Sequence, residues 1–298
     1  MNSNLLKKNK ILTLKTIFLG ILFAALWASA AAAAKIGLHS VEPLVLFQVR
    51  FLVAGIGMLA YSYFIQKDRL PQGKEWKELT IFGLLNVTLY LSFFVLGIKE
   101  VAAGIGSLST ATNPLFISIL SAFWLGRNVK TLEWFAVFLG MIGVGIACYP
   151  LIQNSYATPL GLLYMFLCML SYSVGTIYYS NIDWKLSRTA INGWQVFLGG
   201  ILMLPLTFLL HKTPNNFDLT FLLSEFWLIV PVSVIAVNLW LYLLKIDAVK
   251  ASFFLFLCPI FGFTYSYFLL DEPITHHTFL GTALVIVGLY MGQRKSNK

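Results

Sequence analysis

Two prolines within long apolar runs are the first residues whose placement suggests a chemical role. Pro114 and Pro259 are 145 residues apart, about half of the 298-residue chain. A proline inside a helix removes one backbone donor and pushes its ring toward the carbonyl four residues back, which here frees the carbonyls of Thr110 and Leu255. In a hydrocarbon environment such groups are tolerated only against protein or beside a watery cavity. Paired interruptions in two halves indicate a binding site in a transporter, whereas a lone kink indicates packing.

Hydroxyl and amide side chains gather just before the first of these prolines. Ser109, Thr112 and Asn113 share one helical face, and Ser107 and Thr110 form a neighbouring stripe. Small hydroxyl residues also serve helix–helix contacts in membranes, so packing explains part of this set. Asn113 offers both donors and acceptors, and we predict that it contacts a bound molecule.

Arg50 is the one charged residue well inside an apolar run. It follows Pro43 by seven residues, which is about 10 Å along a helix. An intramembrane ionisable residue marks a functional site by default, and a guanidinium can bind a carboxylate or phosphate through two parallel hydrogen bonds. Two alternatives stay open: the side chain reaches the outer surface, or it pairs with Glu42.

Aromatic residues near the middle of the predicted spans form a further set of candidates. Trp and Tyr usually collect at membrane interfaces, so rings at mid-depth suggest a cavity where they stack on an apolar or aromatic group or a cationic amine. With 46 aromatic residues in the chain, packing is the ordinary alternative for any single ring. The candidates are Trp27, Tyr90, Tyr172, Trp240 and Tyr265, and Asn86, Ser92 and Asn238 are expected to add hydrogen bonds.

The sequence lacks the usual signatures of catalysis and of proton transfer. No aspartate or glutamate falls in the middle of a predicted span, so a carboxylate proton relay has no obvious position. There is no GxxxxGK[ST] loop and no HExxH motif, and His276 and His277 offer only two potential ligands at the start of a span. Cys148, Cys168 and Cys258 all lie in apolar runs without metal-ligand spacing. We therefore predict a protein that is not an enzyme and that has no cofactor and no metal.

The composition is that of an integral membrane protein. Hydrophobic residues make up 58% of the chain, charged residues 11%, and the mean hydropathy is +0.80, whereas about a quarter of a soluble domain is charged. The net charge of +9 comes from residues in short gaps between apolar runs rather than on one basic face. This pattern argues against a nucleic-acid partner and for a lipid bilayer.

Ten apolar runs approach the roughly 20 residues that a helix needs to cross a bilayer. With a cytoplasmic N-terminus, inside segments carry 17 lysines and arginines and outside segments carry 3, which favours both termini in the cytoplasm. The first run has 19 residues, longer than the about 7–15 of a signal peptide, so we expect an uncleaved span. The predicted spans are 16–34, 44–65, 79–97, 102–125, 132–151, 159–178, 191–210, 226–244, 251–270 and 276–292.

The offset of 145 residues relates further features of the two halves. It pairs Trp27 with Tyr172 and Gly143 with Gly288. The constant register predicts two repeats of five spans, residues 1–153 and 154–298. Because five is odd, the second copy would be inserted upside down, and inverted repeats let one site open to each side in turn. We thus predict an all-α integral membrane protein with ten transmembrane helices in two inverted five-helix repeats.

Glycines are frequent in the fifth and tenth predicted spans. Close approach of two helices is their ordinary role in membranes. We expect these spans to form a packing surface or a homodimer surface rather than a substrate wall. The glycines are Gly140, Gly143, Gly145, Gly281, Gly288 and Gly292.

The end of the second half carries a recognisable series of residues. Pro259 is followed by Leu-Leu-Asp-Glu-Pro-Ile at 269–274 and then by Gly281 and Gly288, and 171–176 reads Ser-Tyr-Ser-Val-Gly-Thr. This series resembles the EamA-type transporters of the drug/metabolite transporter superfamily. The first half departs from that pattern, because Arg127 stands where the family has an acidic residue. The resemblance implies a ten-helix carrier with a central cavity that moves amino acids or other small metabolites, often outward.

We therefore predict a secondary active or facilitative transporter of small metabolites, with amino acids as the first class, that exports them across the inner membrane by alternating access. The substrate would bind between the halves beside Pro114 and Pro259. One alternative is a flippase for a lipid-linked phosphate intermediate, which would use Arg50 as a phosphate contact. Another is an integral membrane enzyme, which a pair of carboxylates or histidines at common depth would favour; the sequence has no such pair.

Overall fold

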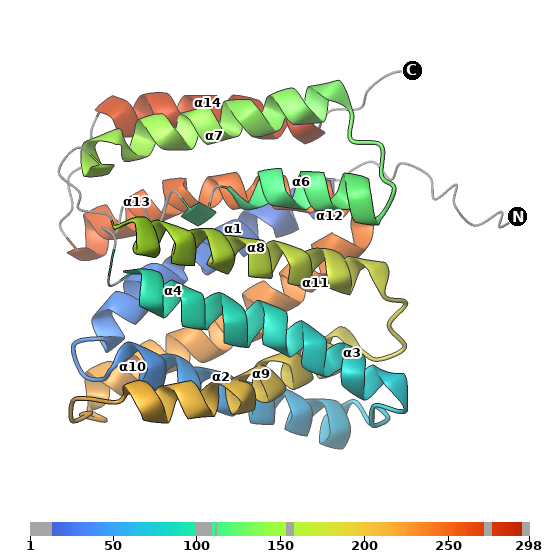
Figure 1. The fold of residues 1–298 in the computed structure, drawn as a ribbon, viewed down its shortest axis with the longest axis vertical. Helices are drawn as coiled ribbons and strands as arrows, with labels where there is room; N and C mark the ends of the chain where they lie inside the picture. Colours follow the sequence, from blue (N-terminus) through green and yellow to red (C-terminus); the bar gives the residue numbers. More distant parts are fainter. Residues whose placement is uncertain are drawn as a thin grey trace, which may run out of the picture.

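A computed structural model describes residues 14–98, 100, 109–110, 112–152, 158–270 and 276–293, and within these residues all regular structure is helical. The helices run roughly side by side as a bundle (Figure 1). In the first half they are α1 (Leu14–Gly37), α2 (Pro43–Ala60) with a π turn at Tyr61–Ile65, α3 (Lys74–Gly83), a π stretch η2 (Leu84–Leu89), α4 (Tyr90–Ile98), α6 (Asn113–Trp124) and α7 (Thr131–Ile152). In the second half they are α8 (Pro159–Asn181), α9 (Arg188–Leu210), α10 (Leu219–Trp227), a π stretch η3 (Leu228–Ala236), α11 (Val237–Ile246), α12 (Ala248–Ser252), a 3₁₀ turn η4 (Phe253–Phe256), α13 (Leu257–Leu270) and α14 (His276–Gln293).

Seven helical segments are long and apolar enough to cross a membrane, so the chain is a multi-pass membrane protein. They are 14–37, 43–65, 74–97, 159–181, 188–210, 219–246 and 248–269. Three shorter apolar helices, 113–124, 131–146 and 279–292, lie where the sequence predicts the other three spans. The count of ten spans therefore stays a prediction.

Hydrogen bonds between loops assign the described loops to the two ends of the bundle. Ser187, before α9, donates to Asp68, after α2, over 2.5 Å, and Lys245, near the end of α11, donates to the carbonyl of Ile182, just after α8. We call this the first end. At the second end, Glu42, before α2, accepts a hydrogen bond of 2.8 Å from Thr213, after α9. Helices α1 and α2 therefore run in opposite directions, and so do α8 and α9, as successive spans should.

Side-chain caps explain where several helices of the second half begin. The hydroxyl of Thr158 accepts from the backbone N–H of Gly161 at 3.0 Å, and the hydroxyl of Ser187 accepts from Ala190 at 3.1 Å. A cap of this kind satisfies one of the four backbone donors left free at a helix start. Asp218 caps α10 in the same way, because its side chain accepts a hydrogen bond from the backbone N–H of Phe221.

The two prolines begin helices rather than kink them. Pro114 lies in the first turn of α6, and Pro259 lies in the first turn of α13, directly after the 3₁₀ turn η4. A proline in the first turn removes no intrahelical hydrogen bond, because that N–H has no partner there in any case. Before Pro259 the helical segment 248–269 narrows into the 3₁₀ turn η4, which packs against α6.

The π stretches also follow the 145-residue register. Residues 84–89 of η2 map onto 229–234, which lie inside η3. Single-turn π segments within α-helices occur often at functional sites. The helices that follow these two stretches, α4 and α11, carry the candidate binding residues Tyr90 and Trp240.

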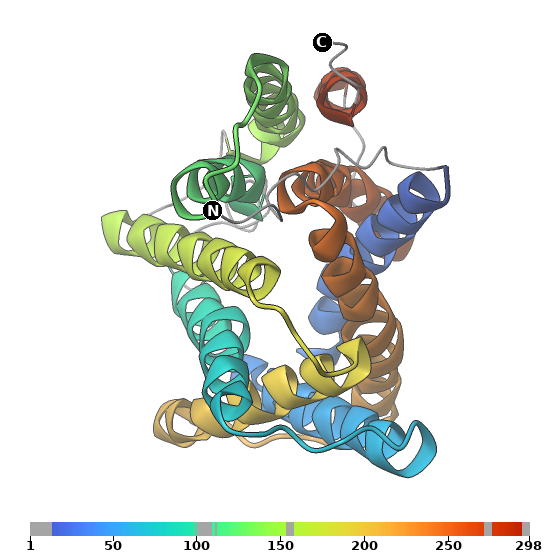
Figure 2. The ribbon, with the colours of Figure 1, turned by 90° about the vertical axis from the view of Figure 1, so that its right-hand side faces the viewer.

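The strongest packing joins the two halves. Helix α7 packs against α14, α2 against α9, α4 against α8 and α1 against α13, and Figures 1 and 2 show α7 and α14 together at one edge of the bundle. A Cβ atom at Gly143 would lie 2.8 Å from the carbonyl oxygen of Gly281, and one at Gly288 would lie 3.0 Å from that of Ala136. These glycines therefore let two backbones touch, which is the packing role expected from the sequence.

Candidate functional site

The predicted aromatic residues Trp27, Tyr90, Tyr172 and Trp240 meet in the interior. They come from α1, α4, α8 and α11, two helices from each half. Ring centroids are 6.1 Å apart between Trp27 and Tyr172, 5.1 Å between Tyr90 and Tyr172, and 6.3 Å between Tyr172 and Trp240. Phe23 completes this central cluster by stacking on Trp240 at 4.9 Å. The sequence had shown no reason to select Phe23 over other phenylalanines.

Several polar atoms in or beside the central cluster are buried without a hydrogen bond. The amide oxygen of Asn86 has no hydrogen bond in the described part of the chain, and the hydroxyl of Tyr172 and the indole nitrogen of Trp240 interact only with each other, without full hydrogen-bond geometry. Asn86 lies in η2 against Gly175 of α8. An unsatisfied buried polar atom costs about 1–3 kcal/mol. Apolar rings with unmet donors and acceptors could therefore gain from a ligand that has both apolar and polar groups.

The predicted residues around Pro114 lie on the α6 side of the bundle. Asn113 is buried, and its amide oxygen accepts a hydrogen bond of 3.1 Å from the hydroxyl of Ser173, on the same helix as Tyr172. Thr110 and Thr112 are half-buried, and the hydroxyl of Thr112 donates to the carbonyl of Ser109 at 2.6 Å. Ser107 lies outside the described residues. Asn113 thus already has a partner, and its amide nitrogen is the group left to contact a ligand.

Two further candidates have local partners. The amide nitrogen of Asn238 donates to the carbonyl of Val234 at 2.7 Å, and the hydroxyl of Tyr265 donates to the carbonyl of Ala25 at 3.2 Å. Ser92 is half-buried on α4. The contacts of Asn238 and Tyr265 join neighbouring turns and helices, and a binding role for these three residues stays a prediction.

Arg50 is buried, with 6% of its surface exposed. Its Nε donates to the hydroxyl of Ser233 in η3 at 2.8 Å, and its guanidinium lies 5.3 Å from the ring centroid of Phe51. The alternative in which Arg50 reaches the surface is therefore wrong. Pairing with Glu42 is also absent, because Glu42 is bonded to the loop after α9.

The structure adds an acid that the sequence analysis missed. Glu225 is 4% exposed and lies inside the continuous helical segment 219–246, where it interacts electrostatically with Arg50. The predicted span began at residue 226, so Glu225 was placed in the preceding loop. Asp218 was the signal that could have corrected this boundary. Its carboxylate accepts from the N–H of Phe221 at 2.9 Å as a helix cap, so an acid lies within a span, near its start rather than at its middle.

Each end of the bundle is closed by polar contacts between the halves. At the second end, the carboxylate of Glu42 accepts hydrogen bonds from the backbone N–H groups of Lys212 and Thr213 at 3.0 and 2.9 Å and contacts His211 at 2.7 Å. Partial burial raises the pKa of Glu42, but the hydrogen bonds from the Thr213 hydroxyl, these backbone groups and His211 outweigh it and lower the pKa to about 2. The carboxylate therefore holds this closure while it is ionised.

The first end has two sets of such contacts. Asp68 joins Ser62 and Ser187 through two hydrogen bonds of 2.5 Å. Elsewhere, the guanidinium of Arg127 pairs with Glu133 at 2.8 Å and with Asp247 of the second half at 3.0 Å. Arg127 occupies the position at which the family that the sequence resembles has an acidic residue. In this structure its ion pair with Asp247 links the two halves.

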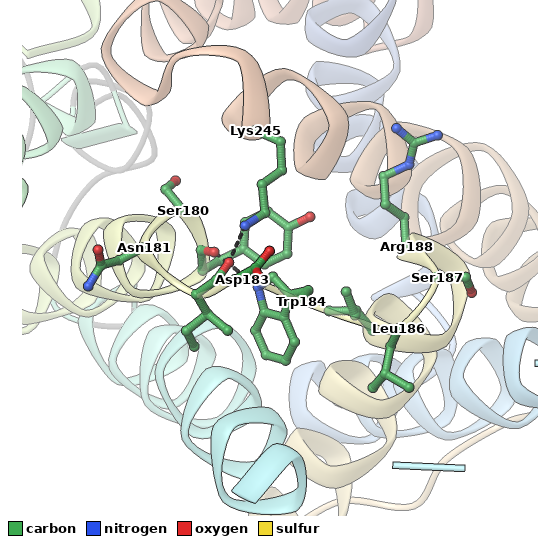
Figure 3. Close-up of a pocket in the computed structure, with 11 residues that line it drawn as sticks. Ser180, Asn181, Asp183, Trp184, Leu186, Ser187, Arg188 and Lys245 are labelled. Atoms are coloured by element: carbon green, nitrogen blue, oxygen red, sulfur yellow. Dashed lines mark hydrogen bonds between the residues drawn. The ribbon is translucent and has the colours of Figure 1, made fainter. Parts of the chain in front are cut away.

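A pocket of about 660 Å³ opens at the first end, between the end of α8, the start of α9 and Lys245 (Figure 3). Tyr179 lines it and donates to the carbonyl of Leu241, next to Trp240, at 3.2 Å. Phe82 stacks on Tyr179 at 5.2 Å, and Trp184 lies 5.8 Å from Tyr179. These three rings form an aromatic plug between the pocket and the central cluster.

Comparisons with known proteins agree with this architecture. The model of the EamA-like transporter family matches the chain twice, at residues 14–149 and 159–292. A solved crystal structure superimposes with a TM-score of 0.80 at 18% identity, covering 93% of this chain and 98% of that one. That likeness shows the same fold.

Curated relatives match over nearly the whole chain. An uncharacterized transporter of Synechocystis is 26% identical over 92% of this chain and 88% of its own length. A protein of Escherichia coli K12 named "Probable amino-acid metabolite efflux pump" is 23% identical over 92% of this chain and 93% of its own length. With both halves matched by the family model, the chain belongs to the EamA-like transporter family of the drug/metabolite transporter superfamily.

Proposed function

We propose that the protein is a secondary active or facilitative transporter that exports small metabolites, with amino acids as the first class, across the cytoplasmic membrane by alternating access. It would have ten transmembrane helices in two inverted repeats, with both termini in the cytoplasm. The observation that carries this proposal is the central cluster, in which rings from both halves surround buried polar atoms that make no hydrogen bond outside the cluster among the described residues. The name of the E. coli relative supports the substrate class and the direction.

The chemistry of the cluster supports a zwitterionic or amphiphilic substrate. Aromatic faces suit an apolar side chain or a cationic amine. The hydroxyl of Tyr172 and the indole N–H of Trp240 can donate to a carboxylate, while the amide oxygen of Asn86 can accept from an ammonium group. The Asn113 amide adds a donor on the side of the proline breaks.

The closures at both ends support alternating access. Toward the first end lie the stacked rings of the aromatic plug, and at the second end lie the contacts of Glu42. Each closure joins elements of opposite halves. Rocking of one half against the other would therefore open one closure while the other holds.

The test is counterflow and uptake in sealed proteoliposomes with a panel of labelled amino acids and small metabolites. Saturable uptake of one class that falls at least about tenfold in Tyr172→Phe, which is about 1.4 kcal/mol in binding, would support the proposal. Tyr267→Phe is the matched control, because that tyrosine is 46% exposed. Asn113→Ala tests the proline side of the site in the same assay.

Two outcomes would count against this function. Equal flux in Tyr172→Phe and Tyr267→Phe would remove the central cluster from the substrate path. No flux for the whole panel would favour the flippase for a lipid-linked phosphate intermediate, and translocation of a labelled lipid phosphate in vesicles would then be the assay.

A further inference from the structure

Arg50 and Glu225 place opposite charges at a common depth in opposite halves. Arg50 follows the first residue of α2 by seven residues, and Glu225 follows the first residue of α10 by six. Both helices begin at the second end, so each charge lies about 10 Å along its helix at 1.5 Å per residue. Helix α10 packs against α2 and, more extensively, against α1 and η3.

Glu225 differs from the other acids whose contacts are described. Both of its carboxylate oxygens are buried and lack a hydrogen bond among the described residues. In contrast, Glu42, Glu75 and Asp247 all lie at helix ends and accept hydrogen bonds. An ionised carboxylate without hydrogen bonds in a dry interior is costly, whereas the protonated form removes that charge.

The surroundings of Glu225 leave Arg50 as its electrostatic partner. From α1, Gly37 contacts Ser224, the neighbour of Glu225, and the charged residue of that last turn is Lys35. The η3 stretch, Leu-Ile-Val-Pro-Val-Ser-Val-Ile-Ala, contains no titratable group. The pair is not in contact, because no ion pair within 4.0 Å joins Arg50 and Glu225 among the described residues. The guanidinium of Arg50 therefore attracts the Glu225 carboxylate but donates no hydrogen bond to its oxygens.

The burial of Glu225 and the side chains around it favour a proton as the ligand of this site. Arg50 is 6% exposed and Glu225 is 4% exposed, so the carboxylate is shielded from bulk solvent. The described residues also contain no group of three or more metal-binding side chains. A proton needs no cavity, and it satisfies a carboxylate by forming an O–H bond.

We propose that Glu225 is a proton-binding site, moderated by Arg50, that couples transport to the proton gradient. The inference rests on the proposed transport function. One proton from the outer solvent adds to the Glu225 carboxylate to give the carboxylic acid, and the same proton leaves to the other side after the halves have moved. With Glu225 ionised, its attraction to Arg50 draws α10 toward α2. With Glu225 protonated, that attraction is lost, so the charge state biases how the halves pack.

The first experiment needs no substrate, because its probe is the proton. Infrared spectra of the purified wild-type protein are recorded from about pH 5 to about pH 9. We expect a carboxylic-acid band that titrates in wild type and in Glu78→Gln, and that is missing in Glu225→Gln. Glu78 lies at the first end and pairs with Lys74, so it controls for removal of an acid. Glu225→Asp should retain a band with a displaced midpoint, which guards against misfolding of the Gln variant.

The second experiment measures the ratio of pH-gradient-driven flux to exchange flux in proteoliposomes, using a labelled amino acid that shows counterflow with wild type. We expect the ratio to fall to about one in Glu225→Gln and to stay at the wild-type value in Glu78→Gln. Identical infrared titrations in wild type and Glu225→Gln, or an unchanged flux ratio, would overturn the inference. Absence of counterflow in wild type would instead contradict the proposed transport function, while the infrared result would still decide on the proton site.

Discussion

Arg50, Ser233 and Glu225 have counterparts in Gln195, Thr88 and Thr80, because the 145-residue register relates the two sets. The frame of the two regions is similar. Ser233 in η3 accepts a hydrogen bond from Arg50 of α2 at 2.8 Å, and Thr88 in η2 donates one to the carbonyl of Gly199 of α9 at 2.8 Å.

The chemistry of the two regions differs. Gln195 is buried and neutral, and its side-chain nitrogen donates to Asn192 at 3.0 Å. Thr80 bonds to the carbonyl of Trp76 at 2.8 Å at an exposed position. The duplicated frame thus carries charges in only one of its two copies, the one formed by Arg50, Ser233 and Glu225. Two symmetric repeats can move in either direction. Under the proposed proton coupling, a charged region in only one of the two copies would let the transporter respond to a proton at one stage of the transport cycle.

We expect the largest loss of stability when Arg50 is neutralised and Glu225 is kept. Arg50→Gln copies the neutral counterpart but removes the charged donor to Ser233 and the charge that attracts Glu225, which together should lower stability by about 3–5 kcal/mol. Adding Glu225→Gln makes the region neutral, and the double variant should recover at least half of that loss. Reversible unfolding in mixed micelles measures the cycle. A double variant no more stable than Arg50→Gln alone would show that the two charges do not interact.

We expect an intermediate loss of stability on removing the hydroxyl group of Ser233, and a smaller one on removing that of Thr88. Ser233→Ala removes a hydrogen bond to a charged group and should cost about 1.5–3 kcal/mol, whereas Thr88→Ala removes a bond between neutral groups and should cost about 0.5–1.5 kcal/mol. The same unfolding assay compares the two variants. Equal losses would mean that the charge on Arg50 adds nothing to its bond with Ser233.

The smallest effect concerns the closures at the two ends, which also follow the register. Glu42 and Thr213 map onto Ser187 and Asp68, so a carboxylate and a hydroxyl exchange places between the ends. The pKa of Glu42 is lowered from 4.5 to about 2. The stability that it contributes is therefore fully present above about pH 4.5 and is lost as the pH falls toward about 2.

Glu42→Gln should weaken this closure at neutral pH and abolish its dependence on pH in that window. Hydrogen exchange of the loop at residues 211–218, measured at several pH values, reports the change. Thr213→Val, which removes one of the hydrogen bonds but keeps the carboxylate, should retain the pH dependence. A loop that opens with the same pH profile in wild type and Glu42→Gln would assign the dependence to another group.

Much of this arrangement could be predicted from the sequence because membranes impose simple rules. Apolar runs and interspersed basic residues marked the helices, and the 145-residue register matched the positions of both proline breaks and of Trp27 with Tyr172. Arg50 was found because a charge within an apolar run is rare. What the register could not show was which neighbours would meet across the bundle, such as Ser233 for Arg50.

The errors have a common physical cause. Glu225 and Glu42 both lie near a helix start, where hydropathy alone does not tell a buried acid from an exposed one. Their roles are decided by caps and by packing from the other half: Asp218 starts α10 seven residues before the predicted boundary, and the loop after α9 occupies Glu42. Pro114 likewise lies in the first turn of α6 rather than within a longer α-helix, which its apolar surroundings in the sequence did not indicate.

The hydrogen bond between Arg50 and Ser233 also has a consequence for biogenesis. The two residues are 183 positions apart, so at a synthesis rate of about 5–20 residues per second the ribosome makes Ser233 roughly 10–40 s after Arg50. During that interval the nascent first half holds a guanidinium in the bilayer without its final partner, and the glycine face of α7 has no α14 to cover it. We therefore expect the first half to be less stable in the bilayer until the second half has been inserted.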